Sequence, residues 1–356
     1  MRHKLVLLLA STLFTALTLE GTVRFFYTKI GNYQTEMFRY AAEHKVITSN
    51  PELPFRHVPN KVGTYYGVEI KTNSIGFRDK EYDTQKPPET QRILVAGDSV
   101  TLGWGVESNQ TFAELLEAMF AAANQKVEVI NMGTGNYNTT MEVALIQAVG
   151  LEFDPDIILL IYFINDAEPT PRPSKLGTFL KKHSYLLALL HGKYLGLVPQ
   201  FNAQLYWENY YRNLYAKDSA SLKTNSQALQ TLMELTKKKN ISLLIVNFPE
   251  LHKPNDYPFE FVTDYVRSQA EDHDIPFLDL LPSLKTQQPQ DLWVSPEDPH
   301  PNAFAHEIAA QEIYMAINDN GLLGKNVIDS GFSKSPLHTV LREDEISLLR
   351  SLIEVP

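Results

Sequence analysis

The chain has 356 residues, of which 44% are hydrophobic, and a formal net charge of -10 at pH 7. This length and apolar content suffice for one large domain with appendages and a packed core. The acidic balance provides no clusters of Lys and Arg for phosphate groups, so we expect no nucleic-acid partner. Because the chain has no cysteine, disulfides, thiolate metal sites, cysteine nucleophiles and lipid attachment to cysteine are all excluded.

The N-terminus combines basic residues with an apolar run. Arg2 and Lys4 precede the uncharged stretch Leu5–Leu19. As a helix this stretch spans about 22 Å, less than the roughly 30 Å core of a bilayer, which favours a cleaved signal peptide. However, no small-x-small cleavage site follows it, and the aromatic segment Glu20–Tyr27 suits a membrane interface. We therefore predict a signal anchor over residues 1–27, with a cleaved signal peptide as the alternative, and the bulk of the chain outside the cytoplasm.

A lead-in segment, residues 28–90, follows the apolar run. It lacks sustained hydrophobic periodicity and contains five prolines, which predicts a segment that wraps around another core and does not act alone. Within it, the stretch Thr72–Asp79 has two interpretations. It is either a turn with Gly76 at its apex or a segment that places Arg78 at the edge of a substrate site.

Strand-like apolar runs alternate with helix-like stretches from Arg92 onward, which indicates a parallel sheet covered by helices. The predicted strands share a high content of Val, Ile, Leu or Phe, and are Ile93–Ala96, Val127–Asn131, Ile157–Phe163, Ile241–Phe248 and Pro276–Leu280. Apolar stripes predict covering helices over Phe112–Ala123 and Ala303–Ile317. The fold class is therefore α/β, a flavodoxin-like three-layer α/β/α arrangement with a central parallel sheet of about five strands.

Two further regions lie outside this pattern. A helical insertion of about 70 residues, 170–239, is longer than a crossover helix needs and is expected to cover the site. Its segments Tyr185–Leu190 and Tyr206–Tyr211 either line an acyl or glycan pocket or pack within the insertion. The C-terminal tail, residues 321–356, contains a predicted amphipathic helix over Leu341–Ile353.

The chemistry centres on a serine and a histidine. The first predicted strand leads into Gly97-Asp98-Ser99, which puts Ser99 at the carboxyl end of a parallel strand, where open α/β sheets bind ligands. A serine hydroxyl is a weak nucleophile unless a base accepts its proton. The candidate base is His300, in a proline-rich loop before a helix that Asn302 can cap. A carboxylate beside it, such as that of Asp298, can fix the imidazole tautomer.

These residues, with two intermediate ones, resemble the four motifs of the SGNH or GDSL hydrolase family over roughly residues 91–320. Gly-Asp-Ser is the first motif, Gly133 after the second strand the second, Asn165 after the third strand the third, and Asp298 with His300 the fourth. The resemblance implies that Ser99 is the nucleophile, His300 the base and Asp298 the orienting carboxylate. It also implies an oxyanion hole built from the backbone N–H groups of Ser99 and Gly133 and the side-chain amide of Asn165.

The chain departs from the family pattern in two places. Many members separate the aspartate and the histidine by two residues, a spacing that points to Glu297; we retain Asp298 because Asp-x-His-Pro-Asn is also a form within this group. Members often have Gly-x-Asn-Asp where this chain has Phe163-Ile164-Asn165-Asp166, a change of turn that keeps the amide donor. A second histidine, His306, lies on a predicted helix and is expected to be packed or solvated.

The resemblance implies a serine-dependent ester hydrolase that works through an acyl-enzyme. An extracytoplasmic setting favours O-acetyl esters of a glycan as substrates. A lipid ester or thioester hydrolase, an O-acyltransferase and a non-catalytic anchored polysaccharide-binding protein are the alternatives. We expect no metal and no cofactor, since no His-x-x-x-His or Glu-x-x-His cluster lies near the motifs; the oligomeric state stays open.

Overall fold

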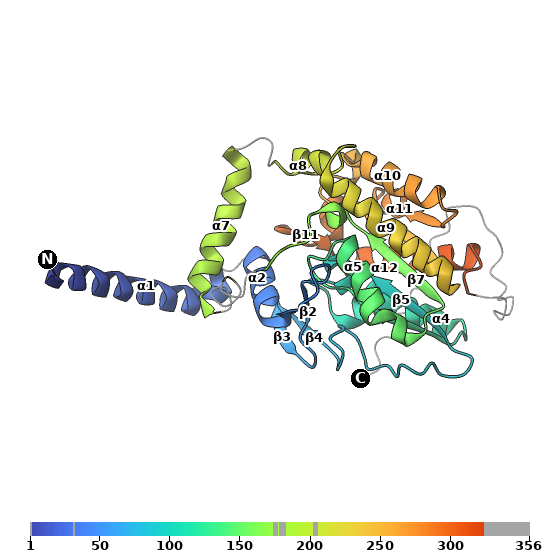
Figure 1. Ribbon diagram of the computed structural model, residues 1–356, viewed down its shortest axis with the longest axis horizontal. Helices are drawn as coiled ribbons and strands as arrows, with labels where there is room; N and C mark the ends of the chain where they lie inside the picture. Colours follow the sequence, from blue (N-terminus) through green and yellow to red (C-terminus); the bar gives the residue numbers. More distant parts are fainter. Residues whose placement is uncertain (1, 31–32, 174–176, 178–182, 202–205, 324–356) are drawn as a thin grey trace.

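The computed structural model describes residues 2–30, 33–173, 177, 183–201 and 206–323. In these residues the centre is an all-parallel five-stranded sheet with the order β6-β5-β7-β8-β9 (Figure 1). The strands are β5 Gln91–Ala96, β6 Val127–Asn131, β7 Ile157–Tyr162, β8 Ser242–Asn247 and β9 Phe277–Asp279. The predicted flavodoxin-like α/β fold is thus confirmed. Because β5 lies between β6 and β7, the strand order reverses direction beside β5, and such a switch point is where doubly wound sheets bind their ligands.

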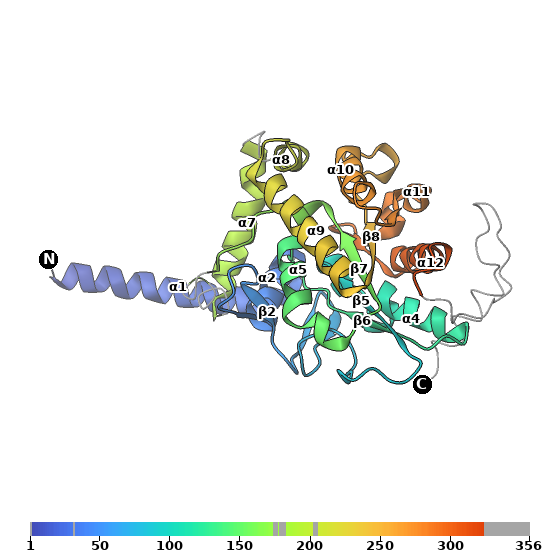
Figure 2. The ribbon, with the colours of Figure 1, turned by 45° about the vertical axis from the view of Figure 1, so that its right-hand side comes forward.

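Helices cover both faces of the sheet (Figure 2). Alternate residues of a strand point to opposite faces, so Leu94 and Ala96 of β5 pack in the layer of α5, α9 and α10, whereas Ile93 and Val95 pack in the layer of α4 and α12. The helix bounds are α4 Phe112–Ala122, α5 Thr139–Ala148, α9 Ala220–Lys239, α10 Glu260–Glu271 and α12 Ala303–Asp319. Both α4 and α12 begin at the residue predicted from the apolar stripes.

Short helices complete this part of the chain. They are α3 Ser99–Leu102, α8 Trp207–Leu214 and α11 Leu281–Leu284, with the 3-10 turns Ser108–Gln110, Gly150–Phe153, Ile164–Ala167, Pro254–Asp256 and Pro289–Leu292. Asn302 caps α12 as expected, since its side chain accepts a hydrogen bond from the N–H of Ala305 at 3.1 Å.

The lead-in segment contains regular structure of its own, namely α2 Tyr33–His44 and two antiparallel hairpins, β1 Lys45–Ile47 with β2 Phe55–His57 and β3 Val62–Tyr65 with β4 Val68–Lys71. Its apolar residues do not form a separate core. Tyr40 and Tyr65 of the lead-in pack with Leu102 and Trp104, which follow β5. The segment therefore shares a core with the chain that leaves the central strand.

The stretch Thr72–Asp79 forms the turn that was one of its two interpretations. Gly76 has φ +95°, and a Cβ there would meet the carbonyl oxygen of His57 at 3.0 Å, so glycine is required. Arg78 is 3% exposed, and its guanidinium donates hydrogen bonds to four carbonyl oxygens, those of Glu69, Leu102, Gly103 and Val106. The interpretation of Arg78 as a substrate-edge residue is wrong, because the side chain is buried away from the cavity lining and its two terminal nitrogens are bonded to backbone carbonyls.

The N-terminal helix α1, Arg2–Ile30, extends away from the body (Figure 1). Among the described residues it contains one stretch, Arg2–Phe26, that is long and apolar enough to cross a membrane, and only 6% of its most apolar window is buried. At 1.5 Å per residue these 25 residues span about 38 Å, more than a bilayer core. The expected shortfall in length is therefore wrong, because the helix continues past Leu19; α1 fits a membrane anchor or a signal sequence.

One part of the insertion between β7 and β8 lies beside α1. The segment Tyr185–Leu190 belongs to α7, Tyr185–Phe201, which lies crosswise at the end of α1 (Figures 1 and 2). There the carboxylate of Glu20 accepts hydrogen bonds from the N–H groups of Tyr185 and Leu186, and so caps α7.

The predicted tail helix over Leu341–Ile353 lies outside the described residues.

Candidate active site

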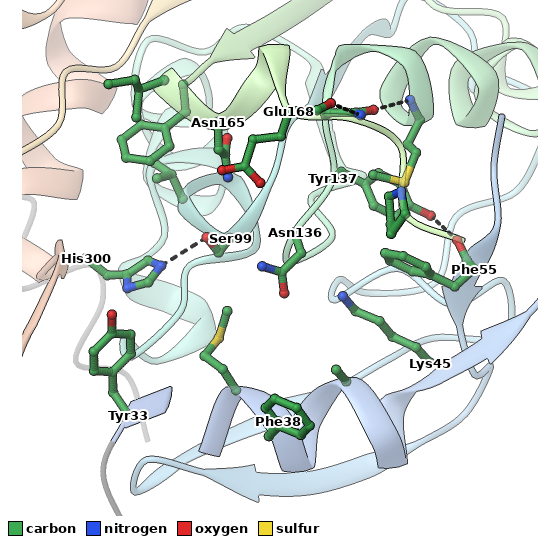
Figure 3. Close-up of a pocket in the computed structure, with 18 of the residues that line it drawn as sticks. Tyr33, Phe38, Lys45, Phe55, Ser99, Asn136, Tyr137, Asn165, Glu168 and His300 are labelled. Atoms are coloured by element: carbon green, nitrogen blue, oxygen red, sulfur yellow. Dashed lines mark hydrogen bonds between the residues drawn. The ribbon is translucent and has the colours of Figure 1, made fainter. Parts of the chain in front are cut away.

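The turn after β5 presents Ser99. A Cβ at Gly97 would overlap the side chain of Thr101, so this sharp turn needs glycine. Asp98 then caps α3, since its carboxylate accepts the N–H of Val100 at 2.8 Å. Ser99 is the first residue of α3, and its hydroxyl faces the cavity beside His300 (Figure 3).

His300 reaches Ser99 from a β-ribbon. It lies in β11, Asp298–Pro301, which pairs antiparallel with β10, Trp293–Ser295; the expected loop is thus wrong, and the extended φ that its prolines prefer suits a strand. Its Nε2 is 3.0 Å from Ser99 Oγ. Its Nδ1 is 2.5 Å from Asp298 Oδ1. Because a carboxylate only accepts hydrogen bonds, we assign the proton to Nδ1, which leaves Nε2 as the acceptor for the serine hydroxyl.

The buried carboxylate beside His300 belongs to Asp298, whereas Glu297 is exposed. Asp298 Oδ1 also accepts the backbone N–H of His300 at 3.1 Å, and its Oδ2 accepts Nε1–H of Trp104 at 2.9 Å. Trp104 was not among the site residues predicted from the sequence. Two features of the sequence could have identified it: a buried tryptophan needs an acceptor for its N–H, and Trp104 follows Ser99 by only five residues.

Gly133 and Asn165, the other two motif residues, both lie beside the Ser99 turn. A Cβ at Gly133 would overlap the backbone N of Leu102, so close packing against α3 requires glycine. Its own N–H donates to Asn131 Oδ1 at 2.9 Å. Asn165, in the 3-10 turn after β7, donates Nδ2–H to Asp98 Oδ2 at 2.8 Å. One amide hydrogen of Asn165 remains for a ligand, while the N–H of Gly133 is engaged within the protein.

Buried acids lie behind the serine. Burial raises the pKa of Asp98, although hydrogen bonds from Val100 and Asn165 and the charge of His300 oppose the rise. Glu142 and Asp166 are both buried, and burial raises the pKa of each well above its ordinary value, to which the charge of Asp98 adds in both cases.

His306 is not part of this arrangement. It is fully buried, its Nδ1 accepts the N–H of Phe112 at 3.2 Å, and its ring stacks on the Phe112 ring. Burial lowers its pKa to about 3, so the ring is neutral at physiological pH. The expectation of a packed histidine agrees with this environment.

A cavity of about 1060 Å³ opens beside Ser99. The core contributes Ser99, Asn165 and His300 to its lining, and the insertion contributes Trp207 and Tyr211. The lead-in forms another wall, with side chains that carry apolar or aromatic surface, namely Tyr33, Met37, Phe38, Lys45 and Phe55 (Figure 3). Among the described residues, no group of three or more His, Asp or Glu side chains is arranged to hold a metal ion.

A family model for the GDSL-like lipase/acylhydrolase family matches residues 95–308, more than half of the chain. Similar solved structures include the acetyl xylan esterase AlAXEase (15% identity, covering 64% of this chain and 99% of that chain, TM-score 0.43). They also include the psychrotrophic esterase EstA from Pseudoalteromonas sp. (14%, 64% and 97%, 0.43) and the lipase/acylhydrolase from Enterococcus faecalis (15%, 65% and 96%, 0.41). The search of curated proteins gave no match. The family match runs from β5 into α12 and so includes every motif residue described above; this chain belongs to the GDSL-like lipase/acylhydrolase family and is a carboxylic ester hydrolase.

Proposed function

We propose that this hydrolase acts through an acyl-enzyme on Ser99. The observation that carries the proposal is the alignment of Ser99 Oγ, His300 and Asp298, with 3.0 Å and 2.5 Å between successive polar atoms. Oγ attacks the ester carbonyl while His300 Nε2 takes its proton, and the imidazolium then protonates the departing alkoxide. A water molecule that gives its proton to Nε2 attacks the acyl-enzyme, and Ser99 regains its proton as the acid leaves.

The oxyanion that forms at each step needs donors. We assign this role to the backbone N–H of Ser99, the second amide hydrogen of Asn165 and the N–H of Gly133. For Gly133 the assignment requires that its N–H exchanges Asn131 Oδ1 for the oxyanion. Removing one such donor costs about 3 to 4 kcal/mol of transition-state stabilisation by analogy with measured cases.

As substrate we propose an O-acyl, foremost O-acetyl, ester of an extracytoplasmic glycan. The exposed apolar helix α1 supports a setting outside the cytoplasm, and the open cavity beside Ser99 has room for a chain that continues beyond the ester. A lipid ester or thioester is the second candidate. It is favoured by the apolar wall of Met37, Phe38 and Phe55, which an acetyl group alone does not fill.

A fluorophosphonate probe tests the nucleophile. Full-length protein in detergent is incubated with the probe and analysed by intact mass, alongside Ser99→Ala, His300→Ala and, as matched control, Ser268→Ala, which removes an exposed hydroxyl on α10. We expect a single adduct on wild type and control and none on the Ser99 and His300 variants. Absence of an adduct on folded wild type would instead favour a non-catalytic binding protein.

A series of 4-nitrophenyl esters from acetate to dodecanoate tests the substrate class. We expect acetate to be released with the highest kcat/KM if a glycan acetyl ester is the natural substrate. Turnover of long chains alone would replace the glycan by the lipid ester. Addition of glycan acceptors, with product analysis by mass, separates transfer from hydrolysis, since both use the same acyl-enzyme.

A further inference from the structure

Lys45, the first residue of β1, extends into the cavity from the wall that faces Ser99 (Figure 3). The residue is 9% exposed. Its ammonium donates a hydrogen bond to the carbonyl of Gly135 and lies 4.3 Å from the ring centroid of Phe55 and 5.0 Å from that of Tyr40. An ammonium has three donors. In the part of the chain that the structure describes, Lys45 has no ion pair and one hydrogen-bond acceptor, so donors remain for a ligand.

Asn136 lies between Lys45 and Ser99 in the same cavity (Figure 3). Its backbone has φ 61°, the left-handed conformation in which asparagine is enriched. Its side chain is exposed and has no hydrogen-bond partner within the described ranges. The preceding Gly135 is held from two sides, because its N–H donates to Tyr40 Oη at 3.1 Å and its carbonyl accepts from Lys45. The amide of Asn136 is thus carried on a braced loop.

A buried ammonium without an anion is costly. Burial lowers the pKa of Lys45 to about 7, against the opposing charge of Asp98. An anion bound in the cavity restores the favourable environment of the charged form. Two acidic residues line the cavity: Glu168 lies beside Asn165 on another part of the wall (Figure 3), and Glu250, which follows β8, is paired with His252. The space between Lys45 and Asn136 is therefore the part of the cavity that suits an anion.

We propose that Lys45 and Asn136 form a subsite for a carboxylate or phosphate group that the ester substrate carries at a distance from the scissile bond. Lys45 supplies the charge and Asn136 a neutral N–H donor. The inference rests on the proposed function and narrows its substrate class to acidic esters. A carboxylate corresponds to an acidic sugar of a glycan, and a phosphate to a lipid headgroup.

Paired esters test the subsite. Phenyl acetate, 4-acetoxybenzoate and 4-acetoxyphenyl phosphate place no charge, a carboxylate or a phosphate on the alcohol side. On the acyl side, 4-nitrophenyl pentanoate is the neutral ester and the 4-nitrophenyl half-ester of glutarate carries the carboxylate. In wild type we expect kcat/KM for at least one anionic ester to exceed that of its neutral partner by about tenfold, the usual effect of one charge-assisted hydrogen bond. Preference for the carboxylate indicates the sugar, and preference for the phosphate the lipid.

Variants assign this preference to the two residues. Lys45→Met should abolish the anionic-to-neutral ratio, Lys45→Arg should keep part of it, and Asn136→Ala should lower it by about threefold. Lys71→Met, which removes an exposed lysine on β4, should keep the wild-type ratio. The proposal is overturned if wild type hydrolyses the anionic and neutral esters with the same kcat/KM. It is also overturned if Lys45→Met slows charged and neutral esters equally, which would mean that Lys45 only braces the Gly135 loop.

A binding measurement separates this failure from failure of the catalytic proposal. In Ser99→Ala, the preferred anionic ester should raise the Tm, and the same ester should raise it less in Ser99→Ala/Lys45→Arg and not at all in Ser99→Ala/Asn136→Ala/Lys45→Met. If the anionic ester raises the Tm of Ser99→Ala but the fluorophosphonate probe does not label wild type, only the acyl-enzyme proposal is refuted. If the probe labels wild type but no anionic ester raises the Tm of Ser99→Ala, only the subsite proposal is refuted.

Discussion

The sheet core and the lead-in segment contribute to the site in different ways. The core supplies Ser99, His300 and Asn165, to which we assign the reaction, from the ends of strands and from the ribbon before α12. The lead-in supplies a wall, with Tyr33 near the His300 ring at 6.2 Å between centroids and Lys45 across the cavity. A parallel sheet brings its strand ends to one edge, so chemistry gathers there in recognisable motifs. A wrapping segment has no such constraint, and its cavity-lining residues carry no motif.

The two regions are nevertheless joined through hydrogen bonds. Arg78 of the lead-in holds the carbonyls of Leu102 and Gly103 in the core. Tyr40 accepts the N–H of Gly135 and contacts His57, whose Nδ1 donates to the carbonyl of Gly76. The wall is therefore fixed relative to Ser99, as a surface that determines specificity would need to be.

The largest expected effect is on the core. Ser99→Ala and His300→Ala should each lower kcat by about 10⁴-fold or more, and the double variant should be no slower than the worse single one, because the two groups act as a unit. Steady-state kinetics on 4-nitrophenyl acetate measures this. Multiplicative effects in the double variant would contradict a shared proton transfer, because they would mean that Ser99 and His300 act independently.

The next effect tests whether the lead-in is structurally separate. Arg78→Met leaves four backbone carbonyls without their donor and should lower the free energy of unfolding by about 3 kcal/mol. Urea unfolding measures it, with the exposed Arg267→Met as a control expected to stay within about 0.5 kcal/mol. An unchanged unfolding midpoint would show that the wrapping segment does not support the core.

Lowering the pH tests how one buried histidine in each region contributes to the free energy of unfolding. Burial lowers the pKa of His57 in the lead-in and of His306 in the core to about 3. Between about pH 6.5 and pH 3 the unfolded chain binds a proton at each position that the native chain does not, so stability falls as pH falls. From pH 7 to pH 5 this costs about 2 kcal/mol per histidine.

Glutamine does not titrate, so replacing His57 or His306 by glutamine removes that histidine's part of the stability lost between pH 7 and pH 5. His57→Gln and His306→Gln should each reduce the difference between urea unfolding at pH 7 and at pH 5 by about 2 kcal/mol. The exposed His273→Gln is the control and should leave the difference unchanged. If the two regions unfold together, one transition shows both effects. A separate early transition that only His57→Gln alters would mean that the lead-in unfolds by itself.

The smallest effect lies at Trp104, where the regions meet. Trp104→Phe removes the N–H that Asp298 Oδ2 accepts and should lower kcat about tenfold with little change in KM, because the residue positions a carboxylate and does not line the cavity. Trp293→Phe removes a similar bond, to the carbonyl of Leu251, and should leave kcat near wild type. Equal losses of kcat in the two variants would assign Trp104 to packing alone.

The sequence by itself determined the elements whose signals are local. Apolar runs located β5 to β9, apolar stripes located α4 and α12, and the strand-end positions of Ser99 and Asn165 followed from these because parallel strands share one ligand-binding edge. The length of α1 was underestimated, since charged residues end an apolar run without ending a helix.

Only the tertiary structure decided which distant residues meet. It brings Asp298 and not Glu297 to His300, because the pairing of β10 with β11 orients the side chains of the ribbon. It joins Trp104 to Asp298 across 194 positions, and it places Lys45 of an unpatterned segment in the cavity of Ser99. Periodicity encodes which face of an element is buried, but contacts between remote segments depend on how the elements pack, and no local pattern contains that information.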